Sequence, residues 1–160
     1  IRLAMGEPIF DWKKIPLSEN IDYKKIKLNI DGVELKEGFA LNVGNPHIVF
    51  FGYSIGETNL DEIGPSIENH KFFPMKTNVE LVEIINSTSL KMRVWERGVG
   101  TTLACGSGAC ASVYAAWKKN LTDNKVEVIL EKGSLFINID NNKAIMTGPT
   151  EISYYGNLEI

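Results

Sequence analysis

The sequence predicts an α+β fold in which a curved mixed β-sheet wraps around one central helix. Three observations favour it: roughly eight short runs of strand type, turn residues between these runs, and one alanine-rich segment, 106–119, that is apolar nearly all round. The chain has 160 residues, of which 44% are hydrophobic and 23% charged, so it can bury the core of one ordinary domain.

Strands joined by turns fill the first part of the chain. The opening residues already form a strand-like run. Lys25–Ile30 and Val33–Leu35 alternate on either side of Asp31-Gly32, which is a strong short-range signal for a hairpin. Phe39–Val43 and Ile48–Tyr53 flank a Gly-Asn-Pro-His turn and predict two more strands.

A short helix is expected after these strands. Thr58 or Asn59 can cap its start, two acidic residues suit its first turn, and it extends to about His70. Gly64-Pro65 lies in the middle of this segment and predicts that the helix is short or broken.

The second half of the chain predicts another hairpin, the central helix and a final group of strands. Asn78–Ile85 and Leu90–Trp95 alternate and are followed by a glycine-bearing loop over 96–104. The helix over 106–119 ends in lysines, which suit a helix C-terminus. Further strands are expected at 126–130, 134–139, 144–146 and 151–155.

Composition and charge exclude several classes of function. The 17 basic and 20 acidic residues give a net charge of −3 without a basic stripe, so we expect no nucleic-acid partner. No apolar run approaches the roughly 20 residues that cross a bilayer, and the opening residues lack a signal peptide, so we expect no membrane partner. Spacings typical of metal sites, of a P-loop and of dinucleotide binding are missing from the sequence, so no metal is expected.

The two cysteines predict a reducing compartment. Cys105 and Cys110 are five positions apart in the predicted helix, an axial rise of about 7.5 Å that exceeds bridging distance. They are therefore expected to be free thiols in the cytoplasm. The chain starts with Ile1 rather than Met, and we interpret it as a piece of a longer polypeptide.

The stretch Glu96–Ala109 carries the strongest chemical signal. It places Cys105 at the start of a helix whose first turn is Gly-Ser-Gly. A helix N-terminus offers unpaired N–H groups and partial positive charge, which favour a thiolate and can bind a carboxylate. The alternative is that Cys105 is a small buried hydrophobic residue, as we expect for Cys110.

Other polar residues allow both structural and functional interpretations. Glu96 and Arg97 follow a strand end, where one can face a pocket, or both can form a solvated ion pair. Asn45 and His47 flank a proline in a turn, and His47 is also a conceivable base for Cys105 in acyl transfer. His70 is expected to face solvent.

With these residues assembled, the chain resembles the C-terminal half of the diaminopimelate epimerases. The matching pieces are MGEP at 5–8, GNPH at 44–47, Asn78, ERGVG through ACGSGA at 96–109, and MTGP at 146–149. They follow the order of the family across almost the whole chain. The resemblance implies the diaminopimelate epimerase-like fold over 1–160, with the last strand, 151–160, packing on an absent N-terminal domain.

The resemblance also implies an activity without pyridoxal phosphate or metal. Enzymes of this family are isomerases that interconvert LL- and meso-diaminopimelate in lysine and cell-wall biosynthesis, using two cysteines on opposite faces of the substrate α-carbon as thiolate base and thiol acid. Cys105 is similar to the second of these cysteines. The other implied roles are carboxylate binding by Gly106 and Ser107, contacts to the substrate amine and distal end by Asn45, Asn78, Glu96 and Arg97, tuning of thiol pKa values by His47 and Glu96, and homodimer packing by Tyr154.

Two substitutions and one absence depart from the family pattern. Thr101 stands where the family usually has Glu, and Ala4 where Asp is common. The N-terminal domain, which supplies the other cysteine, is absent, and Cys110 lies on the same helix as Cys105 and cannot replace it. We therefore expect the isolated chain to be inactive. The alternatives are another amino-acid racemase of the same architecture and a non-catalytic amino-acid-binding module.

Overall fold

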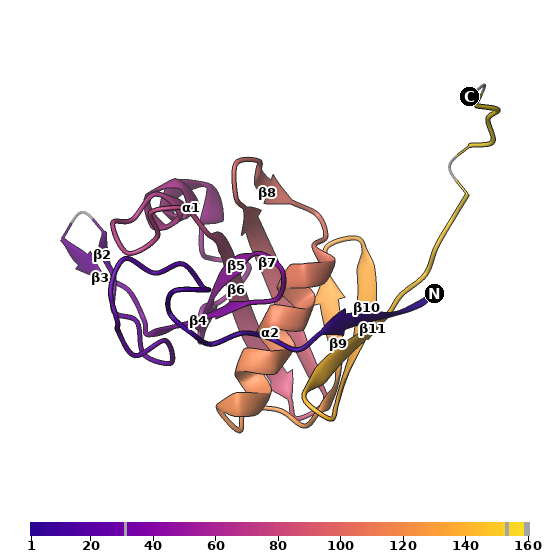
Figure 1. The fold of residues 1–160 in the computed structure, drawn as a ribbon, viewed down its shortest axis with the longest axis horizontal. Coiled ribbons are helices and arrows are strands. Elements are labelled where there is room, and N and C mark those ends of the chain that lie inside the picture. The colour runs from indigo at the N-terminus through magenta and orange to yellow at the C-terminus, as the bar shows by residue number, and fades with distance from the viewer. Residues whose placement is uncertain (31, 153, 159–160) are drawn as a thin grey trace.

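The computed structural model describes residues 1–30, 32–152 and 154–158, and its main feature is a nine-stranded sheet curled around one helix (Figure 1). The elements in chain order are β1 (Arg2–Gly6), β2 (Asn29–Ile30), β3 (Val33–Glu34), β4 (Gly38–Asn42), β5 (Pro46–Phe51), α1 (Leu60–Glu68), β6 (Asn78–Asn86), β7 (Ser89–Glu96), β8 (Gly100–Thr102), α2 (Gly106–Lys118), β9 (Lys125–Leu130), β10 (Gly133–Asp140) and β11 (Lys143–Thr147). The predicted α+β class with a mixed, curved sheet is confirmed.

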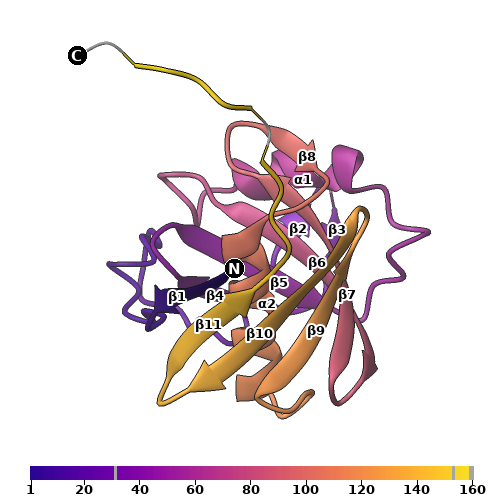
Figure 2. The ribbon, with the colours of Figure 1, turned by 90° about the vertical axis from the view of Figure 1, so that its right-hand side faces the viewer.

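The sheet runs in the order β1-β11-β10-β9-β7-β6-β5-β4, with β8 paired to the end of β7. Figure 2 shows the neighbouring strands β1, β11, β10, β9 and β7 from the side of the sheet that faces away from α2. The pairs β5–β6 and β7–β9 are parallel, and the other pairs are antiparallel. In the parallel β5–β6 pair, His47 lies opposite Asn78. This register brings the Gly-Asn-Pro-His turn next to a residue that is more than thirty positions away in sequence.

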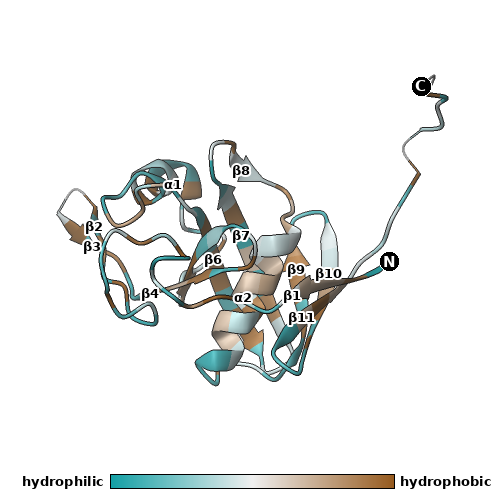
Figure 3. Cartoon of the chain, viewed as in Figure 1, coloured by the Kyte–Doolittle hydropathy of each residue, from teal (hydrophilic) through white to brown (hydrophobic). Residues whose placement is uncertain are grey.

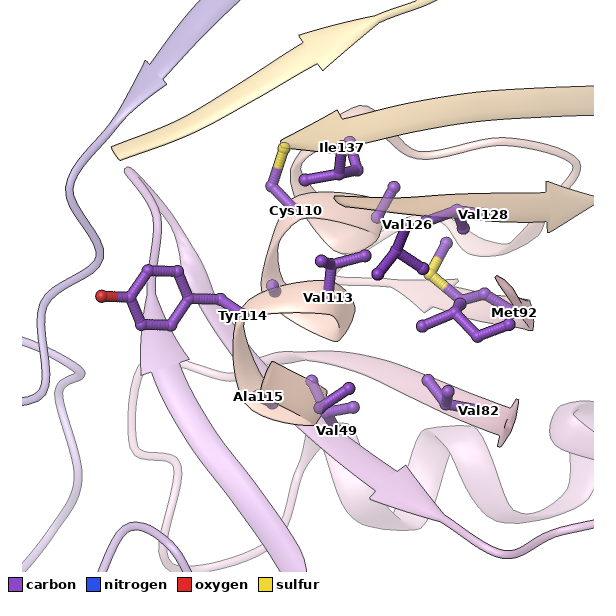
Figure 4. Packing of buried hydrophobic residues seen from close by; sticks show 14 of the residues in the cluster. Val49, Val82, Met92, Cys110, Val113, Tyr114, Ala115, Val126, Val128 and Ile137 are labelled. Atoms are coloured by element: carbon purple, nitrogen blue, oxygen red, sulfur yellow. The ribbon is translucent and has the colours of Figure 1, made fainter. Parts of the chain in front are cut away.

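Helix α2 fills the concave side of this sheet. Every residue from Gly108 to Ala116 is buried, because small alanines let the surrounding strands approach the helix closely. Figure 4 shows Val113 facing the side chains of Met92 on β7 and Val126 on β9. Only the C-terminal end of α2, at Lys118, is strongly hydrophilic (Figure 3). The predicted central helix is therefore confirmed, with its last residue at Lys118 rather than Lys119.

Helix α1 packs on the other side of the sheet, in a second core with residues of β4, β5 and β6. Asn59 caps it by accepting a hydrogen bond from the N–H of Asp61. The helix is short, as expected, but it is not broken, since it continues through Pro65. Gly64 lets the helix pack closely on the sheet, because a Cβ atom there would lie 2.6 Å from the Trp95 ring.

Several predicted elements differ from the structure. The hairpin around position 31 is confirmed, although its strands β2 and β3 have only two residues each and Asp31 lies outside the described residues. Within the predicted loop 96–104, residues 100–102 form β8. The predicted strand at 151–155 is wrong for the residues that the structure describes, which leave the body of the protein as an extended tail (Figure 2). Strand β11 is already flanked by β10 and β1, so it offers no free edge to this tail.

Neither helix is long and apolar enough to cross a bilayer, a finding limited to the described part of the chain.

The close packing of Gly64 on Trp95 predicts that an alanine at position 64 destabilises the protein. In an exposed helix, Gly→Ala stabilises by about 1 kcal/mol. Here Gly64→Ala is expected to lower the free energy of unfolding by about 1–3 kcal/mol, because the methyl group would overlap the half-buried Trp95 ring. The measurement is urea unfolding, with Gly56→Ala as the control, since a Cβ at Gly56 meets no atom within 4 Å. Stabilisation by Gly64→Ala would contradict this packing.

Candidate active site

Cys105 forms the N-cap of α2 and faces the first turn of its own helix. Its backbone is extended, with φ −146° and ψ 112°, and the N–H of Gly108 donates to its Sγ at 3.4 Å. The Ser107 Oγ also lies 3.4 Å from this sulfur. The cysteine is 7% exposed, so its thiol is nearly removed from bulk water while donors of the helix start surround it.

The two glycines of the first turn are required by close neighbours. A Cβ atom at Gly106 would lie 3.0 Å from the Met146 Sδ. At Gly108 it would lie 2.9 Å from an oxygen of the Glu80 carboxyl group, which extends from β6 beneath the helix. The Gly-Ser-Gly sequence therefore lets a buried carboxyl group and the thiol lie against the same helix turn.

A buried acid and a buried histidine lie beside the thiol. The Nδ1 of His47 lies 2.6 Å from the Glu80 Oε1, and both side chains have no exposed surface. On the other side of the ring, Nε2 lies 2.8 Å from the Asn45 Oδ1. The Asn45 amide donates to the Ser107 Oγ at 3.4 Å, so hydrogen bonds connect β6 to the sulfur.

Glu80 is not among the residues predicted from the sequence. In the strand run NVELVEII an acidic residue suggests a solvated position. Strand alternation nevertheless places Glu80 on the same face as Asn78 and the buried Val82, which packs near α2. That shared face was the signal available in the sequence.

Asn78 connects the Gly-Asn-Pro-His turn before β5 to the turn after β7. Its Nδ2 donates to the carbonyl oxygen of Pro46 at 2.7 Å, and its Oδ1 accepts from the backbone N–H of Arg97 at 2.9 Å. The guanidinium of Arg97 is exposed and donates to the carbonyl oxygen of Met75. Its charge is therefore available beside the site.

Glu96 lies close enough to influence Cys105 electrostatically. Its carboxylate accepts a hydrogen bond from the hydroxyl of Thr102 on β8. The strand β8, which replaces part of the expected loop, thus holds this acid in place.

Two predicted residues lie elsewhere. Tyr154 is 84% exposed and belongs to the segment after β11, which Figure 2 shows leaving the body of the protein. His70, expected to face solvent, is half-buried, because its ring packs against Phe72 with centroids 4.8 Å apart.

The pKa of Cys105 lies above the ordinary value of a cysteine, whereas the sequence predicted a favoured thiolate. Burial raises the pKa of Cys105, and the negative charges of Glu80 and Glu96 raise it further. Hydrogen bonds from Ser107 and Gly108 lower it, as expected at a helix start, but they do not outweigh burial. The expectation of a favoured thiolate is therefore wrong for this structure.

Cys110 differs from Cys105. It lies in the core beside Ile137 (Figure 4), and burial raises the pKa of its thiol to about 12. Both thiols are free, which confirms the prediction from their spacing.

Possible metal ligands do not cluster in the structure. Across 1–30, 32–152 and 154–158, no group of three or more His, Cys, Asp and Glu side chains could hold a metal ion.

Solved structures with the same fold include epimerases and racemases. A predicted epimerase from Pseudomonas aeruginosa superposes with a TM-score of 0.57 at 12% identity, over 91% of this chain and 53% of that one. A probable proline racemase from Agrobacterium radiobacter K84 gives 0.55 at 12% identity, over 91% of this chain and 48% of that one. At this identity the likeness defines the fold class alone.

Sequence comparison identifies the family within this class. The model of the diaminopimelate epimerase family matches residues 39–153. The diaminopimelate epimerase of Erythrobacter litoralis is 44% identical over 99% of this chain, and that of Pelagibacter ubique is 44% identical over 93%. The chain belongs to the diaminopimelate epimerase family. It spans 58% and 56% of the lengths of these two relatives.

The raised pKa of Cys105 predicts how alkylation depends on pH. Only the thiolate reacts, so the rate with iodoacetamide should keep rising with pH beyond the ordinary pKa of a cysteine. Ser107→Ala removes a hydrogen bond that lowers the pKa of Cys105 and should slow the reaction at pH 8.5 by about fivefold. Mass spectrometry of the Cys105 peptide measures the rate, and the Cys110 peptide, which should remain unmodified, is the internal control. An alkylation rate that levels off below pH 8 would contradict a raised pKa of Cys105.

Proposed function

We propose that this chain is the C-terminal half of a cofactor-independent epimerase that interconverts LL- and meso-diaminopimelate in lysine and peptidoglycan precursor biosynthesis. The observation that carries the proposal is the position of Cys105, a nearly buried thiol at the N-cap of α2, beside helix-start N–H groups and buried polar side chains. Family membership and 44% identity to curated diaminopimelate epimerases support the substrate.

Cys105 acts as one of two proton-transferring groups. In one direction the thiolate of the second cysteine removes the α-proton from one face, and the S–H of Cys105 donates a proton to the resulting carbanion from the other face and becomes a thiolate. In the reverse direction the thiolate of Cys105 removes the α-proton and the S–H of the second cysteine donates one. The raised pKa of Cys105 supports the thiol as the resting form. A preceding domain supplies the second cysteine on the opposite face of the α-carbon.

The start of α2 binds the substrate α-carboxylate. The N–H groups of Gly106 and Ser107 lie in the first helical turn, where they have no acceptor within the helix. Two N–H donors beside the sulfur would also stabilise negative charge that develops on the carboxylate when the α-proton leaves.

The residues on the neighbouring turns bind the rest of the substrate. Asn45, Asn78, Glu96 and Arg97 contact its amine and distal amino-acid end, a role supported by the hydrogen bonds that join these turns to one another. His47 and Glu96 tune the pKa of the thiols, and the effect of Glu96 on Cys105 supports this role.

The assembly and the location follow from the same proposal. The protein is a homodimer in which Tyr154 contributes to packing, and the exposure of this tyrosine is consistent with a partner surface. It works in the cytoplasm, where its two free thiols stay reduced.

Isotope exchange tests the activity in the full-length protein, meaning this chain joined to the proposed N-terminal domain. Diaminopimelate incubated with it in D₂O should gain deuterium at the α-carbon. Cys105→Ala should reduce the rate by at least about 10²-fold, the loss typical of a general acid or base. Cys110→Ala is the control and should retain exchange. A full-length protein that binds diaminopimelate without exchange is a binding module, and one that exchanges only other amino acids is a different racemase.

The isolated 160-residue chain should show no exchange, because the proposed mechanism needs a second thiol across the substrate. Mass spectrometry of diaminopimelate after incubation in D₂O checks this. Exchange by the isolated chain that disappears in Cys105→Ala would refute the proposal of a half-site.

A further inference from the structure

Glu80 lies at the far end of the hydrogen-bonded chain that reaches Cys105, and the proposed mechanism leaves it unused. It has no exposed surface, and its Oε1 lies 2.6 Å from His47. Its Oε2 is buried and has no hydrogen-bond partner among the described residues. Burying a carboxyl group with one unpaired oxygen costs folding free energy. The contact of its other oxygen with His47 indicates the function that compensates this cost.

The directions of the hydrogen bonds follow from the donors available. The Asn45 amide nitrogen donates to the Ser107 Oγ, so the Asn45 carbonyl oxygen faces His47 and can only accept. The Nε2 of His47 must therefore carry a proton. The Ser107 hydroxyl, which accepts from Asn45, is then free to donate its own proton to the Cys105 sulfur.

The carboxyl group of Glu80 determines the hydrogen bond at the Nδ1 of His47. With Nε2 protonated, Nδ1 either accepts a proton from a neutral Glu80 or donates one to an ionised Glu80. In both cases one proton lies between Nδ1 and Oε1, and the ring is held with its Nε2–H directed at Asn45. Without Glu80, Nδ1 loses this hydrogen-bond partner, so the ring can place its single proton on either nitrogen when the Asn45 amide turns its nitrogen toward Nε2.

We infer that Glu80 is a positioning residue of the thiol site: by fixing the protonation and orientation of the His47 ring, it directs the Asn45 donor to Ser107 and so leaves the Ser107 hydroxyl to donate to the Cys105 sulfur. This inference rests on the proposed proton transfer by Cys105, since it assigns Glu80 to the same site. The contact of Glu80 with the first turn of α2, at Gly108, fixes the carboxyl group relative to the thiol.

Two variants separate this role from the charge of Glu80. Glu80→Gln and Glu80→Leu both remove the ionisable carboxyl group, so they remove equally any influence of its charge on the pKa of Cys105. Only glutamine can donate a hydrogen bond to the Nδ1 of His47, so the difference between the two variants reports positioning. Glu83→Gln, on the opposite face of β6, makes the same chemical change as a control.

The readouts are long-range ¹⁵N–¹H spectra of His47 and the alkylation rate of Cys105 at pH 8.5, both measured on the 160-residue chain. Native chain, Glu83→Gln and Glu80→Gln should all show a proton on Nε2, and Glu80→Leu should show both tautomers. Cys105 should react about fivefold faster in Glu80→Gln than in Glu80→Leu, because only the former keeps the Ser107 donor directed at the thiolate.

Equal rates and equal tautomers in these two variants would overturn the inference. If Glu80→Leu fails to fold, the native spectrum still decides, because an Nε2 without a proton in the native chain is incompatible with the inferred direction. These readouts involve no diaminopimelate, so failure here is distinct from absence of epimerase activity.

Discussion

The burial of α2 inside the curved sheet is the constraint on which the rest of the molecule depends. The helix has a small, apolar surface on all sides from Gly108 to Ala116, so it is stable only when strands enclose it. Enclosure fixes the helix start at the place where β5 and β6 begin side by side. There, hydrogen bonds through Asn45 and Ser107 connect His47 to the sulfur of Cys105, and Asn78 lies opposite His47 in the parallel pair.

The same burial sets the chemistry of the site. It removes the Cys105 thiol from water and raises its pKa, while the first turn of α2 supplies N–H donors that act in the opposite direction. A thiol with these opposed influences can change its protonation state when a neighbouring charge is bound or removed. Such a balance suits a group that both donates and accepts a proton during one reaction cycle.

Local patterns in the sequence predicted the elements, whereas tertiary contacts decided the exceptions. The central helix and the hairpins follow from periodicity and turn residues alone. Helix α1 continues through Pro65 and rests on the Trp95 ring at Gly64, and the tail after β11 cannot pair with β11 because β10 and β1 already flank that strand. Motif resemblance identified residues now seen around the thiol, but it did not identify Glu80, whose burial is indicated in the sequence only by the strand face that it shares with Asn78 and Val82.

We propose that Cys105 lies in the substrate site of a diaminopimelate epimerase. Protection of its thiol is the decisive measurement: the rate of alkylation of the Cys105 peptide in the full-length protein, with and without diaminopimelate. At a concentration about tenfold above the dissociation constant, bound substrate should slow alkylation by about tenfold, and 1,5-diaminopentane, which lacks carboxylates, should not. Binding of diaminopimelate with an unchanged alkylation rate at Cys105 would contradict the placement of this thiol in the substrate site.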